Sequence, residues 1–202
     1  MKKIYWTYAN AVEQVLGFLD SERKDIQKLC LGQEFHEWVE DKVTRTSIVE
    51  NLLKFKETLE IFSYSGHADG EHLLTEEDAS HMEGIAGLLG SCPKIKLVFL
   101  NGCGTKKQVD FLRSQGISVI VYTHSKVDDD LAKIFAVTFF GSLLAGSTVN
   151  ASFIDARSAV KAAASSNARQ IYFRSYRGLE FNNAQPNEWG FIIKRRFMKL
   201  VL

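Results

Sequence analysis

The sequence predicts an α/β fold, a three-layer α-β-α sandwich in which helices cover both faces of a mainly parallel central sheet. Runs of β-branched and aromatic residues alternate along the chain with helical segments of ordinary length, which is typical of parallel sheets. The chain has 202 residues, 46% of them hydrophobic and 24% charged, so it is long enough for one well-buried domain and too short for two ordinary ones. We therefore predict a single domain over residues 1–202.

The first elements follow from composition and periodicity. Ile4–Ala9 is rich in β-branched and aromatic residues, which predicts a strand. Asp20–Leu29 has a helical pattern that Asp20 or Ser21 could cap. Phe35–Val39 is ambiguous and is a candidate second strand.

A clearer helix follows, and Thr46 or Ser47 is the predicted cap at its start. Its apolar residues recur at helical spacing, which places four of them on one face: Ile48, Leu52, Phe55 and Leu59.

The next strand, Leu59–Tyr64, is predicted to be buried, and it runs into a Ser-Gly-His sequence that ends at His67. Ala68–Leu74 is predicted to be an excursion over the strand end. Thr75–Asp78 then opens a helix that reaches about Leu89.

Ile95–Leu100 is the most hydrophobic strand of the chain, and it leads into the sequence Asn-Gly-Cys-Gly-Thr around Cys103. A short helix over Gln108–Ser114 and a strand over Ile117–Tyr122 follow. The remaining predicted elements are helices from Asp128 through Phe140 and over Val149–Ala164, then late strands at Gln170–Arg174 and Gly190–Arg195.

His67 and Cys103 each lie just beyond the carboxyl end of a predicted strand. In parallel sheets of this kind, ligands bind at the carboxyl ends of the strands. If the two strands are neighbours in the sheet, these two side chains can meet although they are far apart in sequence. The sequence therefore predicts a site at this edge of the sheet.

The residue types at that edge fit nucleophilic catalysis. A thiol attacks a carbonyl well only as its thiolate, so it needs a nearby base, and histidine is the usual base near neutral pH. The glycines on both sides of Cys103 let the backbone turn sharply and leave amide N–H groups free to face an oxyanion. Gly66 allows a tight exit before His67, and the amide of Ala68 could face the same site.

The remaining cysteines and histidines have simpler expected roles. Cys30 and Cys92 are expected to be small buried hydrophobes. His67, Asp69 and His72 could together hold zinc, but a further His or Cys pair at ligand spacing is missing, and we expect no metal or cofactor.

Composition excludes several classes of function. The formal net charge is +1, so nothing indicates nucleic acid or a membrane surface as a partner. Three widely spaced cysteines do not form a disulfide framework, which favours reduced thiols in the cytoplasm. Neither a signal peptide nor a membrane-spanning apolar run is expected.

With these residues in place, the sequence resembles the CHAT domains, bacterial relatives of caspases and separases. The matching motifs are a strand ending in Ser-Gly-His, a strand ending in Asn-x-Cys and a Val-Asp-Asp turn before a helix. They occur in Ile61–Gly70, Leu97–Thr105 and Ile117–Gly146, and Leu16–Ile26 is similar to the first helix of the family, so the resemblance extends over nearly the whole chain.

The resemblance implies a caspase-like fold in which Cys103 is the nucleophile and His67 the general base. The backbone amides of Ala68 and Cys103 would hold the oxyanion. Two positions depart from the family pattern, because Ala68 replaces a frequent glycine and no tryptophan precedes the Val-Asp-Asp turn. In relatives, an acidic residue often sets a preference for a basic residue before the cut.

Asp128 or Asp129 is the candidate for that acidic role here, or the Asp128–Asp130 run simply favours a helix N-terminus. Lys126 could instead favour an acidic residue. We predict a cysteine endopeptidase that cleaves a specific protein or peptide partner, in a bacterial defence or cell-death system. Its switch would be a regulatory partner or a sensor fused in a longer protein. The alternative is a CHAT-fold adaptor that binds protein without cutting it.

Overall fold

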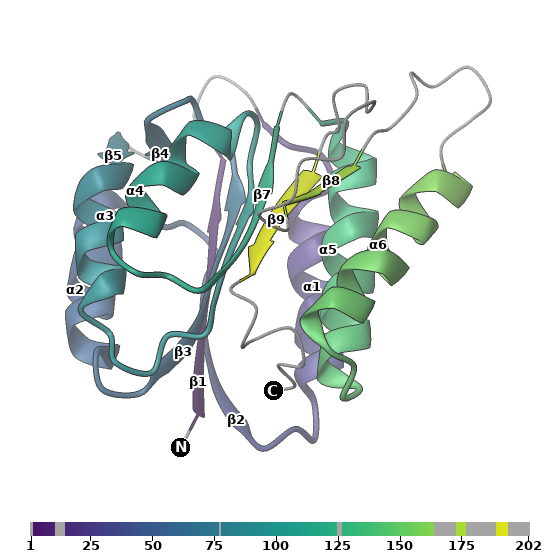
Figure 1. Ribbon diagram of the computed structural model, residues 1–202, viewed down its shortest axis with the longest axis horizontal. Helices are drawn as coiled ribbons and strands as arrows, with labels where there is room; N and C mark the ends of the chain where they lie inside the picture. Colours follow the sequence, from purple (N-terminus) through teal and green to yellow (C-terminus); the bar gives the residue numbers. More distant parts are fainter. Residues whose placement is uncertain are drawn as a thin grey trace.

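A mixed sheet with the order β2-β1-β3-β6-β7-β9-β8 runs through the molecule (Figure 1). The computed structural model describes residues 2–10, 15–76, 78–124 and 127–163, together with strands β8 and β9. The strands of this sheet are β1 (Lys2–Ala9), β2 (Phe35–Glu40), β3 (Leu59–Gly66), β6 (Leu97–Asn101), β7 (Val119–Thr123), β8 (Phe173–Tyr176) and β9 (Trp189–Ile193). The strands from β2 to β7 pair in parallel, whereas β9 runs antiparallel to β7.

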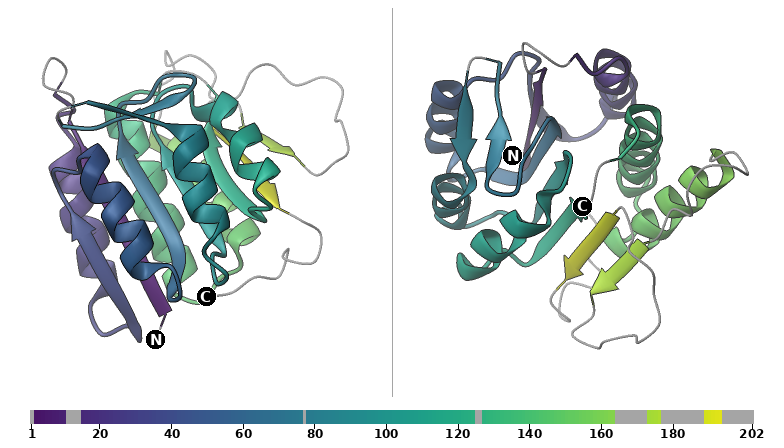
Figure 2. Two further views of the ribbon diagram at one scale, coloured as in Figure 1. Left: turned by 90° about the vertical axis from the view of Figure 1, so that its left-hand side faces the viewer. Right: turned by 90° about the horizontal axis from the view of Figure 1, so that it is seen from above.

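Helices cover both faces of the sheet, as Figure 2 shows from above. One layer consists of α1 (Leu19–Cys30), α5 (Asp129–Leu144) and α6 (Val149–Ala163), and the other of α2 (Arg45–Phe55), α3 (Met82–Gly90) and α4 (Gln108–Ser114). This arrangement confirms the predicted three-layer α-β-α sandwich.

The alternation of side chains along the strands builds a separate core on each face. In β1, Trp6 faces α5, where its ring lies 4.5 Å from that of Phe140, whereas Tyr5 faces the opposite layer. Every residue of β3 is buried, which is expected of a central strand covered on both sides. The polar ends of β3 and β6 are therefore held by rigid, fully packed strands.

The region after β3 differs from the prediction. A small antiparallel hairpin, formed by β4 (His72–Leu74) and β5 (Ala79–His81), occupies residues predicted as an excursion and a helix start. The α3 helix begins only at Met82, because His81 caps it by accepting a hydrogen bond from the Glu83 amide at 3.2 Å.

The start of α2 is also different from the prediction. Thr44 caps this helix in a reciprocal capping box with Ser47, rather than Thr46 or Ser47 acting alone. The helix ends at Phe55, and Leu59 belongs to β3 instead of the helix face.

The late strands lie where the sequence places them. β8 and β9 overlap the predicted strands Gln170–Arg174 and Gly190–Arg195, whose remaining residues lie outside the described ones.

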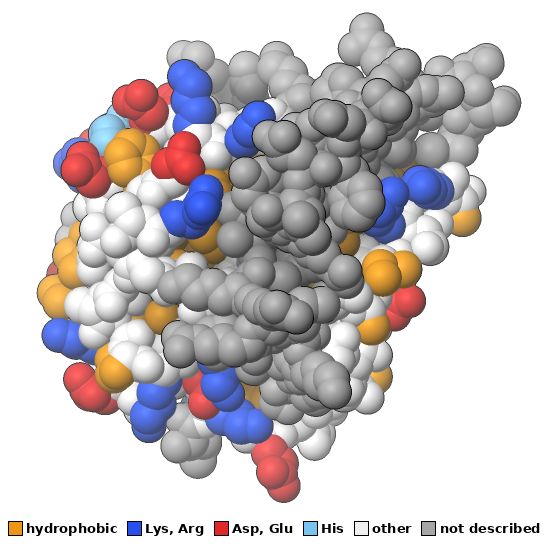
Figure 3. Space-filling view, viewed as in Figure 1, with side chains coloured by type: hydrophobic (Ala, Val, Ile, Leu, Met, Phe, Trp, Pro, Cys, Tyr) orange, Lys and Arg blue, Asp and Glu red, His pale blue; other side chains and the backbone are white. Residues whose placement is uncertain are grey.

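The surface carries both signs of charge. On the face in Figure 3, basic and acidic side chains of the described residues are scattered among one another. None of the described helices has both the length and the apolar character needed to cross a bilayer.

Candidate active site

The structure pairs the two strands that carry His67 and Cys103. β3 and β6 are parallel neighbours, and the last residues in register are Ser65 and Asn101. His67 and Cys103 each follow two residues later, and both line the same pocket at this edge of the sheet. The predicted neighbourhood of the two strands is therefore confirmed.

Two glycines let the strand ends approach each other. A Cβ atom added at Gly102 would lie 2.8 Å from the carbonyl oxygen of Gly66 and 3.0 Å from the Ala68 Cβ. At Gly66, it would lie 2.6 Å from the carbonyl oxygen of Ala9. Gly104 has a φ of 66°, in the left-handed region that glycine adopts most easily. The turn around Cys103 therefore requires glycine for both space and backbone conformation.

Gly102→Ala is expected to lower the free energy of unfolding by about 1–3 kcal/mol, because backbone atoms would have to move to admit the methyl group. Urea unfolding of the purified protein measures this loss. Gly84→Ala is the matched control, since nothing lies within 4 Å of its added Cβ in α3. The control should keep or raise stability by up to about 1 kcal/mol. Equal effects at both positions would contradict the steric account.

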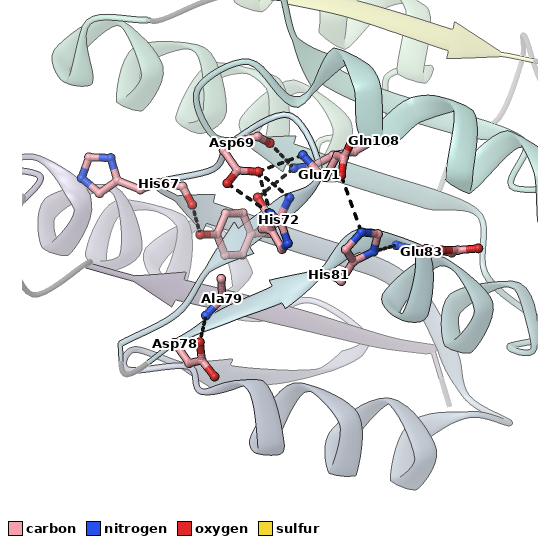
Figure 4. Close-up of polar contacts among 10 residues, drawn as sticks. His67, Asp69, Glu71, His72, Asp78, Ala79, His81, Glu83 and Gln108 are labelled. Carbon is pink, nitrogen blue, oxygen red and sulfur yellow. Dashed lines mark hydrogen bonds and ion pairs between the residues drawn. The ribbon is translucent and has the colours of Figure 1, made fainter.

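Tyr64 and the β4–β5 hairpin both form hydrogen bonds with the backbone of His67. The buried Tyr64 hydroxyl donates to the carbonyl oxygen of His67 and also lies 2.5 Å from that of Leu74. The Leu74 amide donates to the same His67 carbonyl at 3.0 Å. In Figure 4 the imidazole of His67 points away from His72 and His81. The hairpin thus holds the main chain of His67, and the residue lines the pocket.

The amides of Ala68 and Cys103 lie in the two strand-end turns. Ala68 bridges Leu73, and the hydrogen bonds of that bridge use the Asp69 amide and the His67 carbonyl. Because the N–H groups of successive residues point to opposite sides of an extended segment, the Ala68 N–H points away from β4. Thr123 donates to the Gly102 carbonyl, which fixes the peptide plane that also contains the Cys103 amide. Hydrogen bonds of neighbouring groups therefore hold the main chain at both predicted oxyanion donors.

The three thiols lie in different surroundings. Burial, followed by the nearby carboxylate of Glu37, raises the pKa of Cys30 to about 12. Burial also raises the pKa of Cys92. Both are buried as predicted, whereas Cys103 is partly exposed and lines the pocket. Cys103 is therefore the accessible thiol of the three.

A buried acid at the pocket floor was not predicted from the sequence. Glu22 of α1 is only 3% exposed, accepts hydrogen bonds from Ser65 and Asn101, and lines the pocket. Burial raises its pKa from 4.5 to about 8, and the charge of Asp129 adds to the effect. One feature of the sequence indicates this burial: Glu22 lies four residues before the buried Ile26, and therefore on the inner face of the predicted helix.

Of the two predicted substrate-binding residues, Asp129 lines the pocket and Asp128 does not. Asp129 lines the pocket and also accepts a hydrogen bond at 2.8 Å from the Phe18 amide just before α1. Asp128 is exposed at the start of α5 and is not among the lining residues. Lys126 lies outside the described residues.

The structure separates the three residues considered for zinc, because His67 lines the pocket whereas His72 and Asp69 contact each other. His72 Nδ1 lies 3.0 Å and 3.1 Å from the carboxylate oxygens of Asp69. Among the described residues, no group of three His, Cys, Asp or Glu side chains is placed to hold a metal ion.

Comparison with solved structures identifies the fold. The chain is similar to a secreted C11 cysteine protease from Bacteroides thetaiotaomicron, solved in complex with an irreversible peptide inhibitor, with a TM-score of 0.53 and 9% identity. The similarity covers 80% of this chain and 58% of that one, so the chain spans less than two thirds of its neighbour. The fold is caspase-like.

At 9% identity the likeness concerns the fold alone. It confirms the predicted caspase-like α/β sandwich. No protein-family profile matches the sequence, and no curated protein matches it either. Membership of the CHAT family therefore stays a prediction.

Proposed function

We propose that this protein is a caspase-like cysteine endopeptidase of the CHAT type, with Cys103 as nucleophile and His67 as general base. The observation that carries the proposal is that both residues line one pocket at the ends of neighbouring parallel strands. The fold neighbour is a cysteine protease whose structure holds an irreversible peptide inhibitor, which supports the same class of reaction.

The reaction follows from these positions. His67 removes the proton from the Cys103 thiol, and the thiolate attacks the carbonyl carbon of the scissile peptide bond. The amides of Ala68 and Cys103 stabilise the oxyanion of the tetrahedral intermediate. His67 then gives its proton to the leaving amine, which breaks the C–N bond and leaves an acyl group on Cys103. Water hydrolyses this thioester with His67 again as base, and the free thiol is restored.

The pocket favours a basic residue before the cut. Asp129 contributes a carboxylate to it, and the Asn101 Oδ1 is a buried acceptor without a partner among the described residues. No lysine or arginine is among the described residues that line it. Asp129 is therefore the acidic residue proposed to meet the substrate, and Asp128 would act only from the rim.

Peptides with arginine before the cut should be cleaved at least about 100-fold faster, in kcat/KM, than peptides with aspartate there. Asp129→Asn should reduce that preference about tenfold, since it removes the charge but keeps an oxygen for the Phe18 amide. Fluorogenic peptides that differ only at this residue measure the ratio. Asp128→Asn is the matched control and should change it less than about twofold. A preference for aspartate would contradict the assignment.

Iodoacetamide labelling tests the proposed function without a known substrate. Cys103 should react at least about tenfold faster than Cys30 and Cys92, because it is accessible and lines the same pocket as His67. His67→Ala should remove most of that advantage. If Cys103 reacts no faster than the other two, or if His67→Ala leaves its rate unchanged, the protein is instead a protein-binding adaptor on the same fold.

The biological setting is a further part of the proposal. We propose that the substrate is a specific protein partner in a bacterial defence or cell-death system, in the cytoplasm, where three free thiols would persist. A regulatory protein or a fused sensor would switch the enzyme. Incubating the enzyme with proteins encoded beside it, and comparing wild type with Cys103→Ala, identifies the cleaved partner.

A further inference from the structure

Glu22 contacts both strand ends of the site, although the proposed reaction does not use it. Its Oε1 lies 2.5 Å from the Ser65 Oγ, and its Oε2 accepts from the Asn101 Nδ2 at 3.1 Å. Ser65 and Asn101 are register partners in the sheet. Ser65 stands two residues before His67, and Asn101 stands two residues before Cys103. A single buried carboxyl group thus joins the main-chain segments that carry both residues.

Other contacts join the elements around this carboxyl group. Asn101 Nδ2 also donates to the carbonyl oxygen of Ala132 in α5, at 3.2 Å. Lys133 of α5 forms an ion pair with Asp25 of α1, at 2.9 Å. Asn101 thus joins the end of β6 to α5 as well as to Glu22, and the ion pair joins α5 to α1 three residues after Glu22.

We propose that Glu22 is a positioning residue for the Cys103–His67 pair, because its carboxyl group keeps Ser65 and Asn101, and with them the two strand ends, at a fixed separation. This role rests on the proposed peptidase function. It differs from substrate recognition, which is the proposed role of Asp129.

Glu22 performs this role in its neutral form. Burial raises its pKa to about 8, while the hydrogen bonds from Ser65 and Asn101 act in the opposite direction. At neutral pH the Glu22 carboxyl group is therefore protonated in most of the molecules. The Asn101 amide donates to Oε2, so in the neutral form the proton lies on Oε1. The 2.5 Å contact then reverses its direction, because the Ser65 hydroxyl, which donates to a carboxylate, can also accept the proton of a carboxylic acid. Ionisation would bury a charge whose two hydrogen-bond partners are neutral, and the desolvation cost of that charge would favour movement of the Glu22 side chain toward water and away from the two strand ends.

The groups around Glu22 favour the neutral form on balance. Asp129 raises its pKa and Lys133 lowers it, both from α5. The pKa of Tyr8, on β1, is raised by burial and then by Glu22, so its hydroxyl stays neutral in the same range. The remaining titratable groups lining the pocket are His67 and Cys103.

The test compares Glu22→Gln with Glu22→Met in the full chain, using an arginine peptide from about pH 6 to about pH 9. Glutamine reproduces the donor and acceptor of a neutral carboxyl group, whereas methionine offers neither. At about pH 7, Glu22→Gln should keep kcat within about threefold, and Glu22→Met should lose at least about tenfold in kcat with KM nearly unchanged. At about pH 9, wild type should have lost about tenfold, whereas Glu22→Gln should not show this fall.

The possible failures are distinguishable. If wild-type Cys103 shows no selective labelling by iodoacetamide, the proposed function fails and the positioning role fails with it. If labelling is selective but Glu22→Met keeps the wild-type kcat, or Glu22→Gln shows the wild-type alkaline fall, only the positioning role is overturned. A loss confined to KM in both variants would assign Glu22 to substrate binding instead. Should Glu22→Met not fold, Ser65→Ala removes one of the two contacts and should lower kcat about threefold to tenfold.

Discussion

Cys103→Ala is expected to lower kcat/KM for an arginine peptide by at least about 10⁴-fold, because no other thiol among the described residues lines the pocket. The fold should be unaffected, since Cys103 is only partly buried and lies in a turn at the edge of the sheet. Steady-state cleavage, together with a urea unfolding curve for each protein, measures both quantities.

The other two thiols provide the controls for this loss. Cys30→Ala and Cys92→Ala remove buried side chains away from the pocket, so they should alter kcat/KM less than about threefold while lowering stability modestly. Full activity in Cys103→Ala, or a loss of activity in either control at intact stability, would mean that a residue other than Cys103 is the nucleophile.

The second large effect is a fall in stability as the pH rises from about 4.5 to about 8. The folded protein holds the proton of Glu22 with a pKa of about 8, whereas the unfolded chain releases it near 4.5. The stabilisation is therefore complete below about pH 4.5 and is lost progressively until the pH passes about 8. The full difference is at most about 5 kcal/mol.

Urea unfolding at several values between about pH 5 and about pH 9 measures this dependence, and Glu22→Gln is the reference that lacks it. Carboxyl groups with a lowered pKa, namely those of Asp20, Asp25 and Asp69, titrate below this range. The difference between wild type and Glu22→Gln should therefore grow in favour of the variant as the pH rises. If the stability difference between wild type and Glu22→Gln stayed constant, Glu22 would be ionised in the folded protein over the whole pH range of the experiment.

The fold could be predicted because its signals are local and repeated. Strands such as Ile95–Leu100 are continuous apolar runs, as parallel strands buried on both faces require. The glycines around Cys103 indicated a sharp turn, and in the structure Gly102 has no room for a Cβ whereas Gly104 adopts a positive φ. The pairing of β3 with β6 then brought His67 and Cys103 to one pocket.

The features that were missed depend on contacts between distant segments. The short β4–β5 hairpin is held by Gln108, whose buried amide donates to the carbonyl oxygens of Asp69 and His72. Its three-residue strands have too little periodicity to stand out from the following helix. Glu22 is a polar residue in a helix, and only its partners on β3 and β6 explain its burial.

The pairing of Cys103 with His67 is tested most directly by labelling with a peptide ketone that carries arginine. Mass spectrometry of the digested protein should locate one adduct, on Cys103, and His67→Ala should slow its formation by at least about 100-fold. An adduct on Cys30 or Cys92, or a rate that does not depend on His67, would contradict the catalytic pair.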